Sequence, residues 1–138
     1  MRFPYRTAPS SDGSTLYYPF IPIRIGRLHG PATRIFEALV DSGAADCMFH
    51  SSIATAIGLD VKSGLPGQRV GVGGRSEIWV HPISVFVGAH VLQVNAAFSD
   101  TLPLAGLLGR NGFFEYFRIT FDPASEPPGL ELERVHKA

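Results

Sequence analysis

Apolar residues in this chain occur in short runs separated by glycine, proline and small polar residues. Within the longer runs, apolar and polar positions alternate with a period of two, which is typical of strands with one buried face. Two stretches, 51–57 and 111–116, begin with a candidate serine or asparagine cap and predict short helices. The whole pattern indicates an all-β barrel or sandwich with one or two short helices. The alternating runs predict strands over residues 16–25, 35–40, 61–70, 78–87, 91–96 and 117–121.

The predicted strands lie between two polar ends. Residues 1–15 end in the turn-forming sequence Ser-Asp-Gly-Ser and are expected to form a flexible arm. Residues 16–122 hold the predicted elements and form the expected single domain, in keeping with a length of 138 residues. Residues 123–138 are mostly polar and are expected to be a frayed C-terminal tail.

Composition narrows the class of protein. Twelve basic and twelve acidic side chains give a formal net charge of zero, which argues against binding to nucleic acid or to an anionic membrane. A hydrophobic share of 45% excludes a disordered chain. Neither a leader-like apolar segment nor a run near the roughly 18 residues of a membrane span is present, so we expect a cytoplasmic protein. Cys47 is the single cysteine, which rules out a disulfide framework within the chain.

The segment most informative about chemistry is Ala-Leu-Val-Asp-Ser-Gly-Ala at 38–44. An apolar strand ends at Asp41, and a hydroxyl and a glycine follow it. Taken alone, the Asp-Ser-Gly tripeptide is typical of an Asx-turn, in which the aspartate caps its own backbone. Two other segments favour a catalytic role for Asp41 over a simple turn. They are Leu-Leu-Gly-Arg-Asn at 107–111 and the glycine-rich turn at 71–74.

These three segments, in this order and at this spacing, resemble the retroviral-type (retropepsin) aspartic proteases. The resemblance runs from about Tyr18 to Phe121. It implies a closed all-β barrel that is active as a twofold homodimer, acts on a polypeptide substrate and needs neither a metal nor another cofactor.

The resemblance also implies roles for individual residues. Asp41 would be the catalytic aspartate, Ser42 would hydrogen-bond its counterpart across the dimer, and Gly43 would offer backbone groups to the peptide. The remaining implied positions are Ala44 in substrate binding, Gly71, Val72, Gly73 and Gly74 in a flap tip that closes over substrate, and Leu108, Gly109 and Arg110 in support of the site, with Arg110 forming an ion pair.

The chain departs from the retroviral pattern at two places. Ala45 stands where retroviral members commonly have an acidic residue, and Asp46 is the next candidate partner for Arg110. The chain also continues past Phe121, whereas the final strand of retroviral members pairs across the dimer. Because of this extension, the dimer interface of this chain can differ from the one that retroviral members form with their final strands.

The catalytic motif occurs once. Asp-Gly-Ser at 12–14 has the residue types in another order, and Asp-Thr-Leu at 100–102 lacks the glycine. Hydrolysis by this chemistry needs two carboxyl groups that share one proton, one acting as base and the other as acid. The second aspartate is therefore expected to come from a second copy of the chain, placed by a twofold axis.

Other interpretations remain beside this one. A retropepsin-like module that binds peptides or proteins with little or no cleavage would have the same fold, because a fold by itself does not establish activity. A monomer that dimerises only with substrate, or after trimming of its ends, is a third possibility. Cys47 and His50 have zinc-ligand spacing, but a zinc site needs about four ligands.

Overall fold

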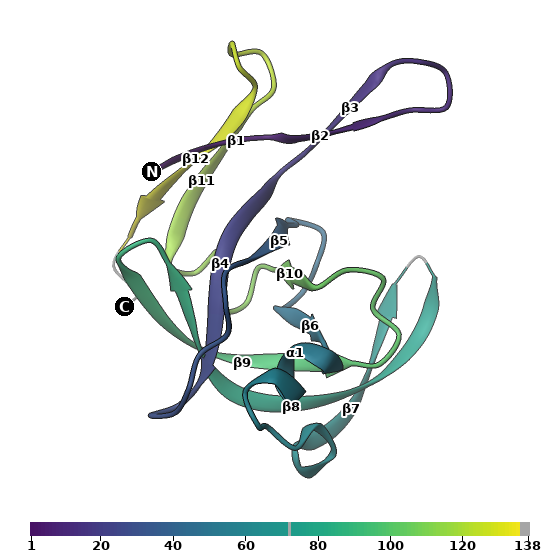
Figure 1. Cartoon of the computed structure of the whole chain (residues 1–138), viewed down its shortest axis with the longest axis vertical. Coiled ribbons are helices and arrows are strands. Elements are labelled where there is room, and N and C mark those ends of the chain that lie inside the picture. Colours follow the sequence, from purple (N-terminus) through teal and green to yellow (C-terminus); the bar gives the residue numbers. More distant parts are fainter. Residues whose placement is uncertain (72, 136–138) are drawn as a thin grey trace.

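The computed structural model describes residues 1–71 and 73–135, and most of them lie in strands (Figure 1). Burial along the strands alternates between successive residues, as the sequence pattern predicted. In β8, for example, Ile83, Val85 and Val87 are buried and the residues between them are more exposed. The elements are β1 (Arg2–Pro4), β2 (Arg6–Pro9), β3 (Thr15–Tyr18), β4 (Phe20–Arg27), β5 (Phe36–Val40), β6 (Met48–His50), α1 (Ser51–Ala56), the 3-10 helix η1 (Val61–Ser63), β7 (Leu65–Gly71), β8 (Gly74–Val87), β9 (His90–Ser99), β10 (Gly106–Leu108), β11 (Phe117–Asp122) and β12 (Gly129–Arg134).

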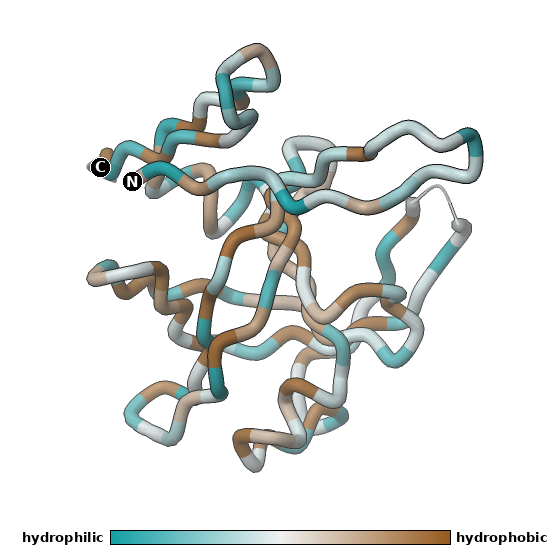
Figure 2. Tube along the Cα trace, turned by 45° about the horizontal axis from the view of Figure 1, so that its top comes forward, coloured by the Kyte–Doolittle hydropathy of each residue, from teal (hydrophilic) through white to brown (hydrophobic). Residues whose placement is uncertain are grey.

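The largest sheet closes into a six-stranded barrel. Its strand order is β4-β5-β10-β6-β9-β8-β7, and an additional pairing of β4 with β8 completes the ring. β7 remains outside the ring as the second strand of a long hairpin with β8. Closure leaves few free edges and buries a continuous core that includes Ile21, Phe49 and Phe98. Hydrophobic positions, in brown, recur along the strands of the barrel in Figure 2. The expected all-β closed barrel is confirmed.

β10 enters the barrel between two strands that come much earlier in the chain. It runs parallel to β5, with Leu108 opposite Val40, and antiparallel to β6, with Gly106 opposite Phe49. Gly106 has no substitute here, because a Cβ would lie 2.7 Å from the Phe49 ring. This insertion brings residues 41–47, which follow β5, beside residues 109–111, which follow β10.

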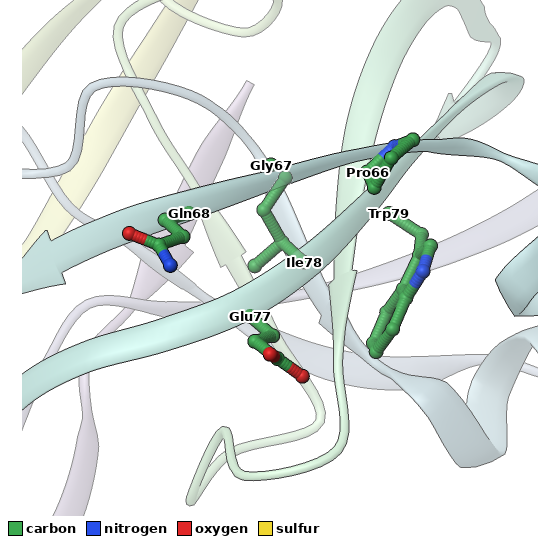
Figure 3. A pocket seen from close by; sticks show the side chains of 6 residues that line it. All are labelled: Pro66, Gly67, Gln68, Glu77, Ile78 and Trp79. Carbon is green, nitrogen blue, oxygen red and sulfur yellow. The ribbon is translucent and has the colours of Figure 1, made fainter.

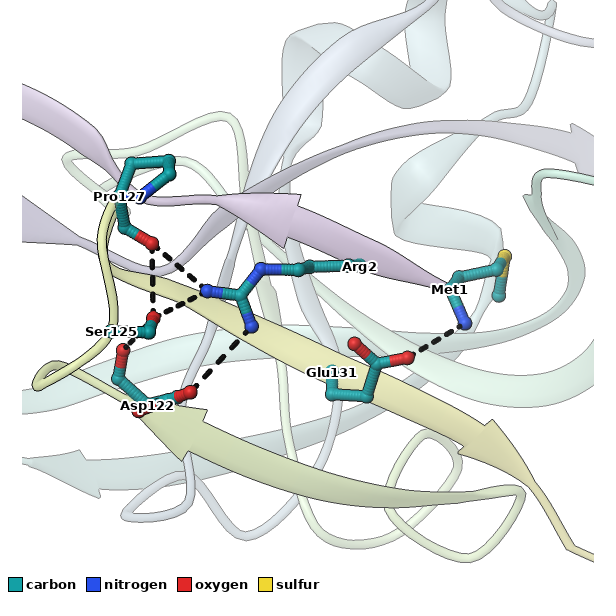
Figure 4. Close-up of polar contacts among 6 residues, drawn as sticks. All are labelled: Met1, Arg2, Asp122, Ser125, Pro127 and Glu131. Carbon is teal, nitrogen blue, oxygen red and sulfur yellow. Dashed lines mark hydrogen bonds and ion pairs between the residues drawn. The ribbon is translucent and has the colours of Figure 1, made fainter.

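The first and last described strands of the chain pair with each other. β12 lies between β1 and β11, and Phe3 is opposite Leu130 in this sheet (Figure 4). Arg2 donates to the Pro127 carbonyl at 2.9 Å and lies 3.7 Å from the Asp122 carboxylate. Contrary to expectation, the arm predicted at 1–15 contains the strands β1 and β2, and the tail predicted at 123–138 contains β12; residues 136–138 of that tail lie outside the described residues. The apolar side chains that decide this pairing lie at opposite ends of the sequence.

β2 and β3 form a two-stranded hairpin by themselves, with Thr7 opposite Tyr17. The hairpin extends away from the barrel, toward the same side of the molecule as the β7–β8 hairpin, in both Figure 1 and Figure 2.

The two predicted helices had different outcomes. The helix near 51–57 is present as α1, although its cap is His50, whose ring accepts from the Ser52 N–H at 3.1 Å. Residues 111–116 form turns instead of a helix, because Gly112 has a φ of 99°, outside the helical region. The strand predicted from residue 61 begins only at Leu65, after η1.

Candidate active site

Asp41 lies directly after β5, at the point where that strand leaves the barrel core. Its backbone N–H donates to the Leu108 carbonyl at 3.0 Å, so β10 fixes the position of the residue. Its carboxylate oxygen Oδ1 accepts from the Gly43 N–H at 2.8 Å, and the Ala44 N–H donates to the Asp41 carbonyl at 3.2 Å. The Asx-turn is therefore real, and it is the device that holds this half-buried carboxylate in a fixed orientation.

We define the Asp41 loop as residues 41–47. The residues after β10 fix this loop by hydrogen bonds and close packing. The Arg110 N–H donates to the Ala44 carbonyl at 3.0 Å, and the Arg110 guanidinium donates to the Ser42 carbonyl at 2.9 Å. Gly109 is packed so closely that a Cβ would lie 2.3 Å from the Asp46 carbonyl oxygen. The structure thus brings Leu108, Gly109 and Arg110 against the loop, although Arg110 donates to a carbonyl there and not to a carboxylate.

The acidic partner that the sequence suggested for Arg110 is engaged elsewhere. Asp46 accepts from Arg69 of β7, with Arg69 Nη2 2.6 Å from Oδ2 and Nε 3.1 Å from the same oxygen. Because this carboxylate bonds and attracts the guanidinium, it raises the pKa of Arg69. Arg69 was missed by the sequence analysis, since only the register of β7 shows that its side chain points toward the loop.

The glycine-rich turn ends the β7–β8 hairpin, as expected of a flap. Gly71 is opposite Gly74, and Gly74 has a φ of 104°, which favours glycine. A Cβ at Gly71 or Gly73 would meet no atom within 4 Å, so this end of the hairpin is open. Val72, the fourth predicted flap residue, lies outside the described residues.

The hairpin is connected to the Asp41 loop through Arg69, and to the segment after β9 through a hydroxyl pair. Ser76, which is opposite Arg69 in the hairpin, accepts from the Thr101 hydroxyl at 3.3 Å. Residues opposite each other in an antiparallel pair point to the same face, so Arg69 and Ser76 mark the inner face of the hairpin. The contacts to the Asp41 loop and to Thr101 are therefore both made from this inner face.

A shallow pocket of about 340 Å³ lies on the hairpin stem and contains none of the residues from Asp41 to Ala44 (Figure 3). The Lys62 ammonium group lies 5.5 Å from the Trp79 ring centre, within the range of a cation–π contact. The pocket is lined by Pro66, Gly67, Gln68, Glu77, Ile78 and Trp79.

Cys47 is the last residue of the Asp41 loop, and its side chain is buried, with 1% exposed. Burial raises the pKa of its thiol to about 12, so the sulfur stays protonated at neutral pH and is a poor nucleophile. The His50 ring is engaged by Ser52, and no group of three metal-ligating side chains occurs among residues 1–71 and 73–135. No described helix is long and apolar enough to cross a membrane.

The structure thus presents an aspartate at a strand end and links the loop that carries it to the β7–β8 hairpin. The family model of aspartyl proteases matches residues 25–111, which is more than half of the chain, and the chain belongs to this family. The matched region contains the Asp41 loop, the β7–β8 hairpin and Arg110.

Solved structures agree with the fold. The chain is similar to EIAV protease in complex with the inhibitor HBY-793, with a TM-score of 0.52 and 20% sequence identity. The similarity covers 67% of this chain and 82% of the EIAV chain. Among curated proteins, no match was found.

Proposed function

We propose that this chain is an aspartic endopeptidase that works as a homodimer, with one Asp41 from each copy at a shared active site. The observation that carries the proposal is the Asp41 carboxylate itself. It is presented at the end of a barrel strand, oriented by the Gly43 N–H at 2.8 Å, and supported by Arg110 from the β10 side. Family membership supports the same chemistry.

One chain supplies one carboxyl group, and the chemistry needs two. Two aspartates that face each other cannot both ionise easily, so the pair holds one proton and titrates as a unit. The ionised carboxylate takes a proton from water as the water oxygen attacks the peptide carbonyl. The protonated partner donates its proton to the reacting peptide, and the C–N bond breaks when the nitrogen gains a proton. Activity is therefore expected at acidic to near-neutral pH.

The substrate in this proposal is an extended polypeptide bound between the Asp41 loops and the two flaps. Backbone groups at Gly43 and Ala44 and at the flap turn from Gly71 to Gly74 would bind it through main-chain hydrogen bonds. Ser42 would connect the two loops below the carboxylates. Apolar residues around the site suggest hydrophobic side chains beside the scissile bond, which a digest of a peptide library tests.

The direct test is cleavage of a quenched peptide by the wild-type protein and by Asp41→Asn, across pH, with sedimentation of both. Asp100→Asn is the matched control, since Asp100 is an exposed aspartate outside the loop. We expect both variants to sediment as dimers and only Asp41→Asn to lose cleavage, by at least a thousandfold. Cleavage that survives Asp41→Asn would refute the mechanism.

The second candidate is a binding module of the same fold. Ala45, next to the proposed substrate-binding residues, is the observation that favours it, because the loop lacks the acidic residue common in retroviral members. Dimers that bind the peptide but cleave it at no pH would support this alternative.

A further inference from the structure

The β2–β3 hairpin is a ribbon whose two faces are both left uncovered by the rest of the chain. All four residues of β3 are exposed, and in β2 only Ala8 is partly buried. The exposed side chains include large apolar ones: Leu16 is 41% exposed, Tyr17 50% and Tyr18 38%. Alternation along a strand places Tyr17 on the face opposite Leu16 and Tyr18.

A ribbon of this kind is poorly stabilised by itself. Isolated two-stranded hairpins are marginally stable in water, and they become stable when a face packs against another element. Within the described chain, β2 pairs only with β3. Tyr18 contacts the Phe20 ring at its base, with ring centres 6.1 Å apart, but Leu16 and Tyr17 remain 41% and 50% exposed, as expected of a contact surface whose partner is another molecule.

The base of the ribbon lies beside the proposed catalytic residue. The Pro19 carbonyl, directly after β3, accepts from the Val40 N–H at 2.9 Å, and Val40 precedes Asp41. An ion pair between Arg6 of β2 and Glu37 of β5 fixes the other strand of the ribbon to the same barrel strand. The ribbon therefore leaves the barrel within a few ångströms of the Asp41 loop, where a second copy must lie if two Asp41 side chains are to meet.

The length of the ribbon matches this placement. From Tyr18 back to Asp12 at the turn is six residues, which at about 3.3 Å per residue spans roughly 20 Å. That span exceeds the radius of gyration of about 13 Å that is typical of a domain of 100 residues. A ribbon that starts beside Asp41 is therefore long enough to reach onto a neighbouring copy.

The ribbon is the better candidate for a contact between two copies, because the other terminal strands already have partners within the chain. The terminal strands β1, β11 and β12 pair with one another inside the chain. In the ribbon, Arg6 is neutralised by Glu37, and the Asp12 carboxylate accepts from Ser14 within the turn. With Arg6 paired, the ribbon has no basic patch for nucleic acid or anionic lipid, and its exposed aromatic side chains suit a protein surface.

We propose that the β2–β3 ribbon clasps a second copy of this chain, with Leu16, Tyr17 and Tyr18 buried against the neighbouring barrel. The inference rests on the proposed homodimeric enzyme, and it assigns the dimer contact to a segment N-terminal to the region that matches the family model. Because a twofold interface is reciprocal, the ribbon of each copy would contact the barrel of the other.

The test is the dissociation constant of the dimer, measured by analytical ultracentrifugation in an Asp41→Asn background that prevents self-cleavage. The test variants are Tyr17→Ser and the double variant Leu16→Ser, Tyr17→Ser. The control is Val91→Ser, which removes an apolar side chain 54% exposed on β9. Its β8–β9 turn lies on the side of the molecule opposite the ribbon in Figure 1.

We expect the dissociation constant to rise at least tenfold for Tyr17→Ser and further for the double variant, with Val91→Ser within twofold of the parent. Far-UV circular dichroism checks that the barrel is intact. Equal dissociation constants in all four proteins would overturn the ribbon contact and leave the Asp41 pair standing. A parent protein that stays monomeric at every concentration, with a wild-type protein that does not cleave, would instead remove the proposed function and the ribbon contact with it.

A second measurement needs no substitution in the ribbon. Hydrogen exchange of the amides of residues 15–18 is followed in the Asp41→Asn protein at concentrations above and below the dissociation constant. Protection that falls on dilution supports the clasp. Protection that does not change with concentration contradicts it.

Discussion

Replacing Arg69 by alanine removes the partner of a carboxylate that the fold has largely taken out of water. The Asp46 side chain is 16% exposed, and its Oδ2 lies 2.6 Å from Arg69 Nη2. The pair joins β7 of the flap hairpin to the last part of the Asp41 loop. The effect of the pair on stability is measured by a double-mutant cycle of Asp46→Ala, Arg69→Ala and the two together.

The expected magnitude follows from the burial of the two side chains. Fully exposed ion pairs contribute about 0.2–1 kcal/mol, whereas breaking a buried pair costs about 3–5 kcal/mol. Arg69 is 35% exposed, so solvent screens the pair in part, while the forked geometry and the burial of Asp46 strengthen it. We expect a coupling energy of about 1.5 kcal/mol, and a larger cost for Arg69→Ala than for Asp46→Ala, because the first leaves a charge without its partner.

The assay is urea unfolding of the four proteins at neutral pH, with the exposed pair Arg118–Glu133 as the matched control. Those side chains are 69% and 65% exposed, and their coupling energy is expected to stay below about 0.5 kcal/mol. Peptide cleavage by the same variants should show a raised KM with a smaller change in kcat, because the pair positions the flap strand and includes no contact with Asp41. A coupling energy for Asp46 and Arg69 no larger than that of the control pair would refute the reasoning.

Two further predictions concern Gly109, which is packed against the Asp41 loop, and Cys47, the last residue of that loop. Gly109→Ala should destabilise the fold by about 2 kcal/mol or more in urea unfolding, because its Cβ would lie 2.3 Å from a backbone oxygen, whereas Gly71→Ala, with open space around it, should stay within about 0.5 kcal/mol. Burial raises the pKa of Cys47 from 9.0 to about 12, so unfolding releases the thiol proton above pH 9. The contribution of Cys47 to stability should therefore be constant below pH 9 and fall by about 1.4 kcal/mol by pH 10 relative to Cys47→Ala, and parallel pH curves for the two proteins would contradict it.

Short-range features of this protein could be predicted from its sequence. The alternation of apolar residues predicted most strands of the barrel, and Asp-Ser-Gly after an apolar run predicted a carboxylate at a strand end. These features depend on neighbouring residues, so a linear pattern carries them. The helix predicted at 111–116 failed for a local reason as well, because the positive φ of Gly112 turns the chain before a helix can form.

The tertiary structure decided the contacts between distant residues. The pairing of Arg69 with Asp46 depends on which face of β7 looks toward the loop, and a shift of register by one residue would turn Arg69 away. The pairing of β1 with β12 joins residues about 130 positions apart. The local sequence of either short strand does not predict which strand it pairs with.

The sequence by itself determined that the chain is an all-β domain carrying one aspartate in a turn that can present it, because alternation and turn chemistry are encoded in adjacent residues. Only the tertiary structure decided that β1 pairs with β12 and that the β2–β3 ribbon pairs with no other described strand. The physical reason is that burial is a property of the packed chain, in which the same apolar side chain can be covered by a distant strand or left exposed.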